Sequence, residues 1–179
     1  MPQYSDFIDR LLLREGLLQT LFPTEVFDPE LVRRVREADL AAIAGNHKIV
    51  DQKAFPLLRG ALLYLLDALP EAHTIFQEAK GDLGSYWHGM MHRRDGDFDN
   101  ARYWFRRAGA LPVFAEIHRA AASHSELMAR QTSWDPYVFT GQCEQNRFGE
   151  RGSLQELAAL QRIEFDALFD YGWRQSVSA

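Results

Sequence analysis

The chain has almost no cysteine, since Cys143 is the single one among 179 residues. One thiol excludes an intramolecular disulfide and a zinc site built from cysteines, and such a count is typical of a reducing compartment. Glu144 follows Cys143 and favours the protonated thiol, so a nucleophilic cysteine is not expected. The first residues lack the positive charge of a secretory signal peptide, because Asp6 and Asp9 are the first charged side chains. We therefore expect a cytoplasmic protein.

Long apolar runs are also missing. The longest, residues 54–69, is interrupted by Arg59 and Asp67 and is shorter than the roughly 20 residues that cross a bilayer. We expect no membrane segment. The net charge of −5 argues against broad binding of nucleic acid. A length of 179 residues with 46% apolar side chains is typical of one globular domain, which we expect to span residues 1–179.

Signals for helices are strong, whereas signals for strands are nearly absent. Asp28 with Pro29, and Asp135 with Pro136, each combine a helix N-cap with a proline at the first helical position. Glycines stand where several helices should end. The pattern predicts an all-α fold of about eight or nine helices, with a loop at 148–152. The expected helices cover residues 5–18, 28–45, 54–66, 69–79, 85–94, 97–108, 113–130, 135–147 and 153–169.

The middle of the chain repeats itself with an offset of 29 residues. Small residues recur where two helices could approach closely, and an aromatic ring recurs one turn further on. A single hairpin cannot bury its apolar face, so two such units are expected to stack. The matching positions are Gly60 with Gly89, Leu69 with Phe98, Ala72 with Ala101, Phe76 with Phe105, and Ala79 with Ala108.

The spacing Gly-x11-Ala-x3-Phe-x2-Ala within each unit resembles the tetratricopeptide repeat, or its Sel1-like relatives, over residues 55–110. Two features depart from that family. The period is shorter than its usual 34 residues, and Pro56 and Ser85 stand where a large residue is expected. The resemblance implies antiparallel hairpins in an α-α superhelix. The segments 86–94 and 103–107 also resemble the signature of an uncharacterised family, which implies no activity.

Stacked repeats of this type expose a concave surface. The first hypothesis is therefore a binding or scaffold protein that recognises a peptide, a partner helix or a small anionic ligand, with a homodimer as a further option. The residues expected to line that surface are Leu57, Ala61, Tyr64, Tyr86, Met90 and Arg93.

A cluster of arginines adds a second binding element. Arg93, Arg94, Arg102 and Arg106 lie close together in the sequence and could hold a phosphate or carboxylate bidentately. The alternative is a solvated helix face on which these side chains pair with aspartates. The predicted ligand-binding set is Tyr86, Met90, Arg93, Arg94, Arg102 and Arg106.

His88 and His92 are four residues apart on an expected helix, so both rings project from one face. This spacing suits two ligands of a zinc or iron ion. A third ligand would come from elsewhere, and the sequence offers Asp95, Asp99, His118 and His124.

The alternative for His88 and His92 is a pair of core histidines bonded to Asp97, Asn100 or a backbone carbonyl, and in that case no cofactor is expected. If the two histidines are instead catalytic, they would bind a metal ion or move protons. Arg93, Arg102 or Arg106 would then hold an anionic substrate. An enzyme of this kind is the alternative to the binding scaffold.

Overall fold

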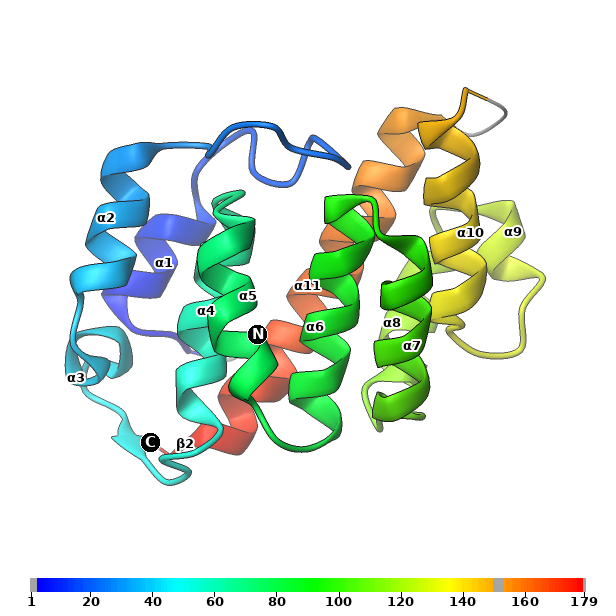
Figure 1. The fold of residues 1–179 in the computed structure, drawn as a ribbon. Helices are drawn as coiled ribbons and strands as arrows, with labels where there is room; N and C mark the ends of the chain where they lie inside the picture. Colours follow the sequence, from blue (N-terminus) through cyan, green and yellow to red (C-terminus); the bar gives the residue numbers. More distant parts are fainter. Residues whose placement is uncertain (1–2, 150–152, 179) are drawn as a thin grey trace.

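The structure is a computed structural model that describes residues 3–149 and 153–178, and Figure 1 shows an all-α arrangement. Residues 150–152 of the expected loop lie outside the described residues. Eleven helices and one pair of two-residue strands occur in the described ranges. The elements are α1 (Asp6–Leu12), α2 (Pro29–Glu37), α3 (Leu40–Ala44), β1 (Lys48–Ile49), α4 (Phe55–Leu65), α5 (Leu69–Glu78), α6 (Asp82–Asp95), α7 (Phe98–Ala108), α8 (Phe114–Ala121), α9 (Glu126–Ala129), α10 (Pro136–Arg147), α11 (Leu154–Ser176) and β2 (Val177–Ser178).

The predicted helix starts are confirmed by their caps. The carboxylates of Asp28 and Asp135 each accept hydrogen bonds from the two backbone N–H groups at the start of α2 and α10. Asp97 accepts from the N–H of Asn100 at the start of α7, and Ser153 opens α11 in the same way. Each cap satisfies backbone donors that have no partner within the helix.

Two helices predicted as continuous are each divided in two, which raises the number of helices above the predicted eight or nine. The backbone of Ala38 is extended, and Asp39 caps a new helix by accepting from the N–H of Ala42 at 2.6 Å. Ser125 likewise opens α9 by accepting from the N–H of Met128. A side chain that can cap interrupts a helix when its oxygen competes for backbone donors.

The four helices α4 to α7 form two consecutive antiparallel hairpins (Figure 1). A Cβ atom added at Gly60 would lie 2.6 Å from Cε1 of Phe76, and one added at Gly89 would lie 2.7 Å from Cδ1 of Phe105. The two glycines therefore allow the same close approach of helix and ring in each hairpin, as the 29-residue offset predicts.

The long helix α11 crosses the hairpins and packs against α4 and α8 (Figure 1). The ring of Phe165 stacks parallel to that of Tyr64 at 6.0 Å between centroids and meets Trp87 edge-on. The six residues predicted to line an open concave surface are all buried. That expectation of an open surface is corrected, because α11 of the same chain packs against these residues through Phe165 and Glu164.

A short pair of strands joins two segments that are far apart in the sequence. β1 and β2 pair antiparallel, with Lys48 opposite Ser178 and Ile49 opposite Val177, which ties the end of α11 to the segment before α4. Within residues 3–149 and 153–178, none of the helices combines the length and apolar character needed to cross a bilayer.

Candidate metal centre

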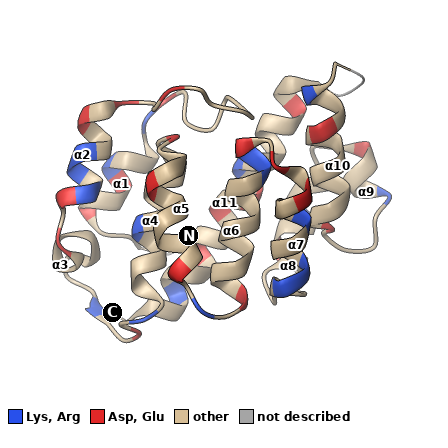
Figure 2. Cartoon of the chain, viewed as in Figure 1, with Lys and Arg blue, Asp and Glu red and all other residues tan. Residues whose placement is uncertain are grey.

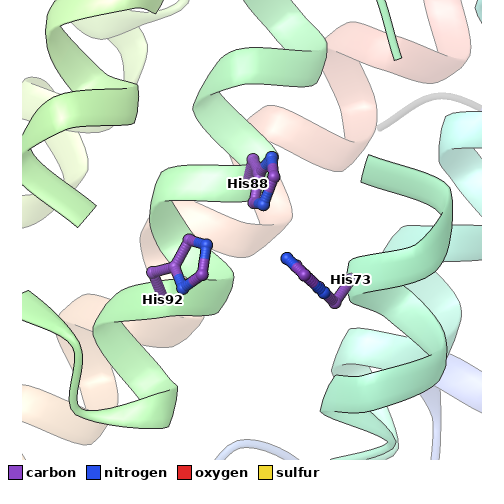
Figure 3. Close-up of side chains that lie close together, drawn as sticks. All are labelled: His73, His88 and His92. Atoms are coloured by element: carbon purple, nitrogen blue, oxygen red, sulfur yellow. The ribbon is translucent and has the colours of Figure 1, made fainter. Parts of the chain in front are cut away.

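Three histidines from two neighbouring helices converge at the contact between the hairpins. His73 projects from α5, and His88 and His92 project from α6 (Figure 3). One potential ligand atom from each ring can be chosen so that all three lie within 4.8 Å of one another. His73 is thus a further potential metal ligand beside the pair that the sequence predicts.

The rings of the three residues are in direct contact. Those of His88 and His92 are nearly parallel, with 4.8 Å between centroids, as expected for neighbours one turn apart. His73 meets both edge-on, with its centroid 4.8 Å from that of His88 and 5.2 Å from that of His92. The three imidazoles therefore surround one small volume.

His88 is the innermost member of the cluster, with 2% of its surface exposed. One face of its ring stacks on Trp104 of α7 at 4.0 Å between centroids. Neither of its ring nitrogens has a hydrogen-bond partner among residues 3–149 and 153–178. Burial, and then the nearby His92 and His73, lower the pKa of His88 to about 3, so the ring is neutral at pH 7.

His92 has a polar partner. The amide nitrogen of Asn100 lies 3.1 Å from its Nε2. Burial is the main cause that lowers the pKa of His92, and nearby His73 adds to it, while Asp97 and Asp95 partly oppose the shift. The alternative of a core histidine bonded to Asn100 therefore describes His92, but it does not describe His88.

A cavity of about 220 Å³ adjoins the cluster. His73 and His92 form part of its wall, and Asp95 lies beside them at the end of α6. Because Asp95 follows His92 by three residues, its carboxylate lies on the same side of the helix. One side of the cluster therefore faces a cavity whose wall is mixed, with Leu69, Pro70 and Met91 beside the polar residues, while Trp104 covers the other side.

The other three ligand candidates are engaged elsewhere. Asp99 is paired with Arg102 at 3.4 Å. Nε2 of His118 lies 2.9 Å from the carbonyl oxygen of Gln131, and Nδ1 of His124 lies 3.0 Å from that of Ala120. Of the four candidates from the sequence, only Asp95 shares the cavity with the histidines.

Arg93 and Arg94 are buried and already paired. Arg93 binds Glu164 of α11 through both terminal nitrogens, and Tyr86 donates a 2.7 Å hydrogen bond to the same carboxylate. Arg94 donates to Asp67 at 2.5 Å and to the carbonyl oxygen of Tyr64 at 2.9 Å. These contacts correct the expectation that Tyr86, Arg93 and Arg94 line an accessible ligand site.

The remaining members of the predicted ligand-binding set lie apart from those two arginines. Met90 is fully buried in the core, Arg102 pairs with Glu144 of α10, and Arg106 is exposed on α7. The arginines of α6 and α7 therefore face different partners, and their side chains do not converge on one anion.

The sequence contains a feature that indicates the contact of His73 with His88, but comparing residues within one hairpin does not reveal it. It lies eight residues before Gly81, and His88 lies seven residues after it. In two antiparallel helices joined at a turn, residues at similar distances from the turn lie at the same level along the two helices. His73 and His88 lie on either side of the turn between α5 and α6, which is the contact between the two hairpins and not a contact within either hairpin.

Comparison with models of protein families, with curated proteins and with solved structures finds no match for this chain. Its function is therefore inferred from the geometry and chemistry of its own residues.

Proposed function

We propose that the protein binds a divalent transition-metal ion through His73, His88 and His92. The observation that carries the proposal is the state of His88, whose two nitrogens are buried without hydrogen-bond partners in the described part of the chain. An unpaired buried polar group costs about 1–3 kcal/mol. A metal ion between the three rings would bind one of these nitrogens and offset part of that cost.

The ligand set favours zinc. Neutral imidazoles bind Zn²⁺, Cu²⁺, Ni²⁺ and Fe²⁺, and three histidines are a known zinc arrangement. With metal–nitrogen bonds of roughly 2.0–2.1 Å, ligand atoms of a tetrahedral ion lie roughly 3.4 Å apart. The three ligand atoms are spread over up to 4.8 Å, so the rings must turn inward by about 1 Å on binding.

Asn100 suits a supporting role. Metal-bound histidines commonly donate their second ring N–H to a neighbouring acceptor, which fixes the orientation of the ring. Asn100 already lies 3.1 Å from His92, and a rotated amide would present its oxygen to that N–H. The side chain would then hold His92 in the orientation that the ion requires.

The fourth coordination position would face the cavity beside Asp95. A water molecule there, held by three protein ligands, is the arrangement of catalytic zinc sites, in which the ion lowers the pKa of the bound water. Asp95 would either bind the ion itself or accept a proton from that water. Such a site would suit a metal-dependent enzyme. The arginines predicted to hold its substrate would not take part.

A binding scaffold is the second proposal. The observation in its favour is that one face of the hairpins already packs against a helix, namely α11. A peptide or partner helix would have to displace α11 or use another face. The buried pair of Arg93 and Glu164 opposes displacement, so we rank this function below metal binding.

The experiment is a calorimetric titration of chelator-treated protein with Zn²⁺, together with elemental analysis of the untreated protein. We expect one ion per chain. The variants His73→Ala, His88→Ala and His92→Ala should each weaken binding at least about 100-fold, since even supporting residues typically contribute 10–100-fold. His124→Ala is the matched control, because His124 is exposed and distant in sequence. Equal Zn²⁺ affinity in the wild type and the three cluster variants would refute the proposal.

A further inference from the structure

A second cavity lies far from the histidines in sequence, between α1, the turn that follows it, and α2. Its volume is about 630 Å³, within the range of small-molecule sites, which is roughly 300–1,000 Å³. The wall is largely apolar, and Leu13 on it is 81% exposed. The apolar residues of the wall are Phe7, Leu11, Leu13, Leu31 and Val35.

Three arginines also line this cavity, namely Arg10, Arg14 and Arg34, and Asp6 is the one carboxylate in its wall. The formal charge of the lining is therefore +3 − 1 = +2, although the whole chain carries −5. Figure 2 shows basic and acidic segments interleaved on α1 and α2 at this end of the molecule, so the positive charge is confined to the cavity wall. The cavity thus combines an apolar wall with local positive charge.

These arginines differ from their neighbours in having no ion pair. On α2, Arg33 pairs with Glu30 and Glu37, and Arg36 pairs with Glu71. Arg34 lies between them in sequence and faces the cavity. Across the two described ranges, Arg10, Arg14 and Arg34 make neither an ion pair nor a side-chain hydrogen bond.

The wall carries three arginines and one carboxylate, and outside it Glu30 attracts Arg34 at longer range. Arg10 lies in the last turn of α1 and Arg14 lies two residues after the helix ends, and both line the cavity, so their like charges repel. An anion between the guanidinium groups would offset this repulsion and accept their hydrogen bonds. An apolar body attached to that anion would cover the exposed Leu13.

We propose that this cavity binds a small amphipathic anion, in which a carboxylate or phosphate is attached to an apolar chain or ring. The arginines hold the charged group through bidentate hydrogen bonds, the mode for which the planar guanidinium is suited. The apolar wall holds the rest of the ligand. The site is independent of the proposed metal centre, because the two share no residue.

The test uses octanoate as the probe, with octanol as its uncharged match and hexanoate and acetate as shorter anions. Binding to the full chain is measured by calorimetry at low and at high salt. We expect octanoate to bind one per chain and at least roughly tenfold more tightly than octanol. Affinity should rise with each added methylene, by up to roughly fourfold, and should fall as salt screens the arginines.

Two variants separate the cavity from the general basic surface. Arg34→Gln should weaken octanoate binding roughly tenfold. Arg36→Gln on the same helix should leave it unchanged, since Arg36 is outside the cavity and pairs with Glu71. Both side chains are exposed, and circular dichroism checks that both variants remain folded.

Three outcomes would overturn the proposal: equal binding of octanol and octanoate, equal effects of the two variants, or no binding of any probe. Phosphatidylserine vesicles are titrated in parallel. Binding to the vesicles without binding to octanoate would assign the arginines to a membrane surface instead.

Discussion

Arg93 on α6 and Glu164 on α11 form an ion pair in which both side chains are buried, with 1% and 0% of their surfaces exposed. Tyr86 donates to the same carboxylate, and the indole N–H of Trp134 donates to the hydroxyl of Tyr86 at 2.7 Å. The guanidinium also lies over the ring of Phe139, 4.4 Å from its centroid. This network connects the last helix to the repeated hairpins.

Removing the charge of Glu164 should therefore destabilise the fold. In Glu164→Gln the guanidinium of Arg93 remains buried without its counter-charge, which typically costs about 3–5 kcal/mol of unfolding free energy. Urea denaturation measures this loss. Glu37→Gln is the exposed control, since its partner Arg33 is half exposed, and it should cost less than about 1 kcal/mol.

The double variant Arg93→Met/Glu164→Leu tests the cause of that loss. Replacing both charges by apolar side chains is often neutral or stabilising, whereas removing one is not. We expect the double variant to be more stable than Glu164→Gln. A double variant at least as unstable as the single one would contradict the assignment of the loss to an unpaired charge.

Alanine at the two repeat glycines should destabilise the protein, although alanine favours helices. The added Cβ at Gly60 or Gly89 would lie within 2.7 Å of the ring of Phe76 or Phe105. Overpacking of this kind typically costs about 1–3 kcal/mol. Gly141→Ala in α10 is the control, because its Cβ would meet nothing within 4 Å, and it should stabilise by about 0.5–1 kcal/mol.

The contact itself can be tested by combining Gly89→Ala with Phe105→Leu, which shortens the opposing side chain. The second change should cost less in the Gly89→Ala background than in the wild type, since the two residues are in contact. Strictly additive losses in thermal or urea unfolding would show that the close approach of Gly89 and Phe105 does not limit the packing.

Cys143 should react slowly in the native state, and the pH dependence of the reaction should identify why. Burial raises the pKa of its thiol to about 12, from an ordinary value of about 8.5. The thiolate fraction then increases about tenfold per pH unit between pH 8 and 10, because this range lies below the raised pKa. Labelling by a disulfide reagent should follow that increase, whereas an exposed thiol levels off above about pH 9. A rate that levels off there while hydrogen exchange shows no local opening around Cys143 would contradict the raised pKa.

His88→Phe distinguishes an unpaired ring from a core histidine that has its hydrogen bonds. Phenylalanine keeps an aromatic ring against Trp104 and removes two nitrogens that lack partners in the described structure. In metal-free protein this variant should be at least as stable as the wild type, since an unpaired buried polar group is lost. Zn²⁺ should no longer raise its melting temperature, while the wild type gains about 2.7 kcal/mol at 100 times the dissociation constant. Lower stability of the metal-free variant would indicate that His88 has bonded partners.

The parts of the fold that could be predicted from the sequence depend on local chemistry. The caps at Asp28, Asp97 and Asp135 act within one turn, and the close contact of Gly60 with Phe76 follows from the repeat. The break at Asp39 was missed because a capping residue inside a helical pattern can equally point to solvent. Whether Asp39 caps a new helix or points to solvent depends on its tertiary surroundings and not on its neighbours in sequence.

The site was predicted only in part for a related reason. The pairing of His88 with His92 is a property of one helix, but His73 reaches them across the contact between two hairpins. Glu164 is 71 residues from Arg93 in sequence, and a charged residue in an amphipathic helix is ordinarily expected at the surface. Without this partner, the arginines of α6 appear available to an external anion, although the fold uses Arg93 and Arg94 internally.

Visible and X-ray absorption spectra of the chelator-treated protein, loaded with Co²⁺ in place of Zn²⁺, test the proposed histidine site most directly. We expect one tetrahedral or five-coordinate ion per chain with three imidazole ligands and an oxygen ligand. His73→Ala should remove one imidazole from the spectrum or abolish binding, and His124→Ala should change nothing. Octahedral Co²⁺ with fewer than three imidazoles, or a spectrum unaffected by His73→Ala, would contradict a metal site between α5 and α6.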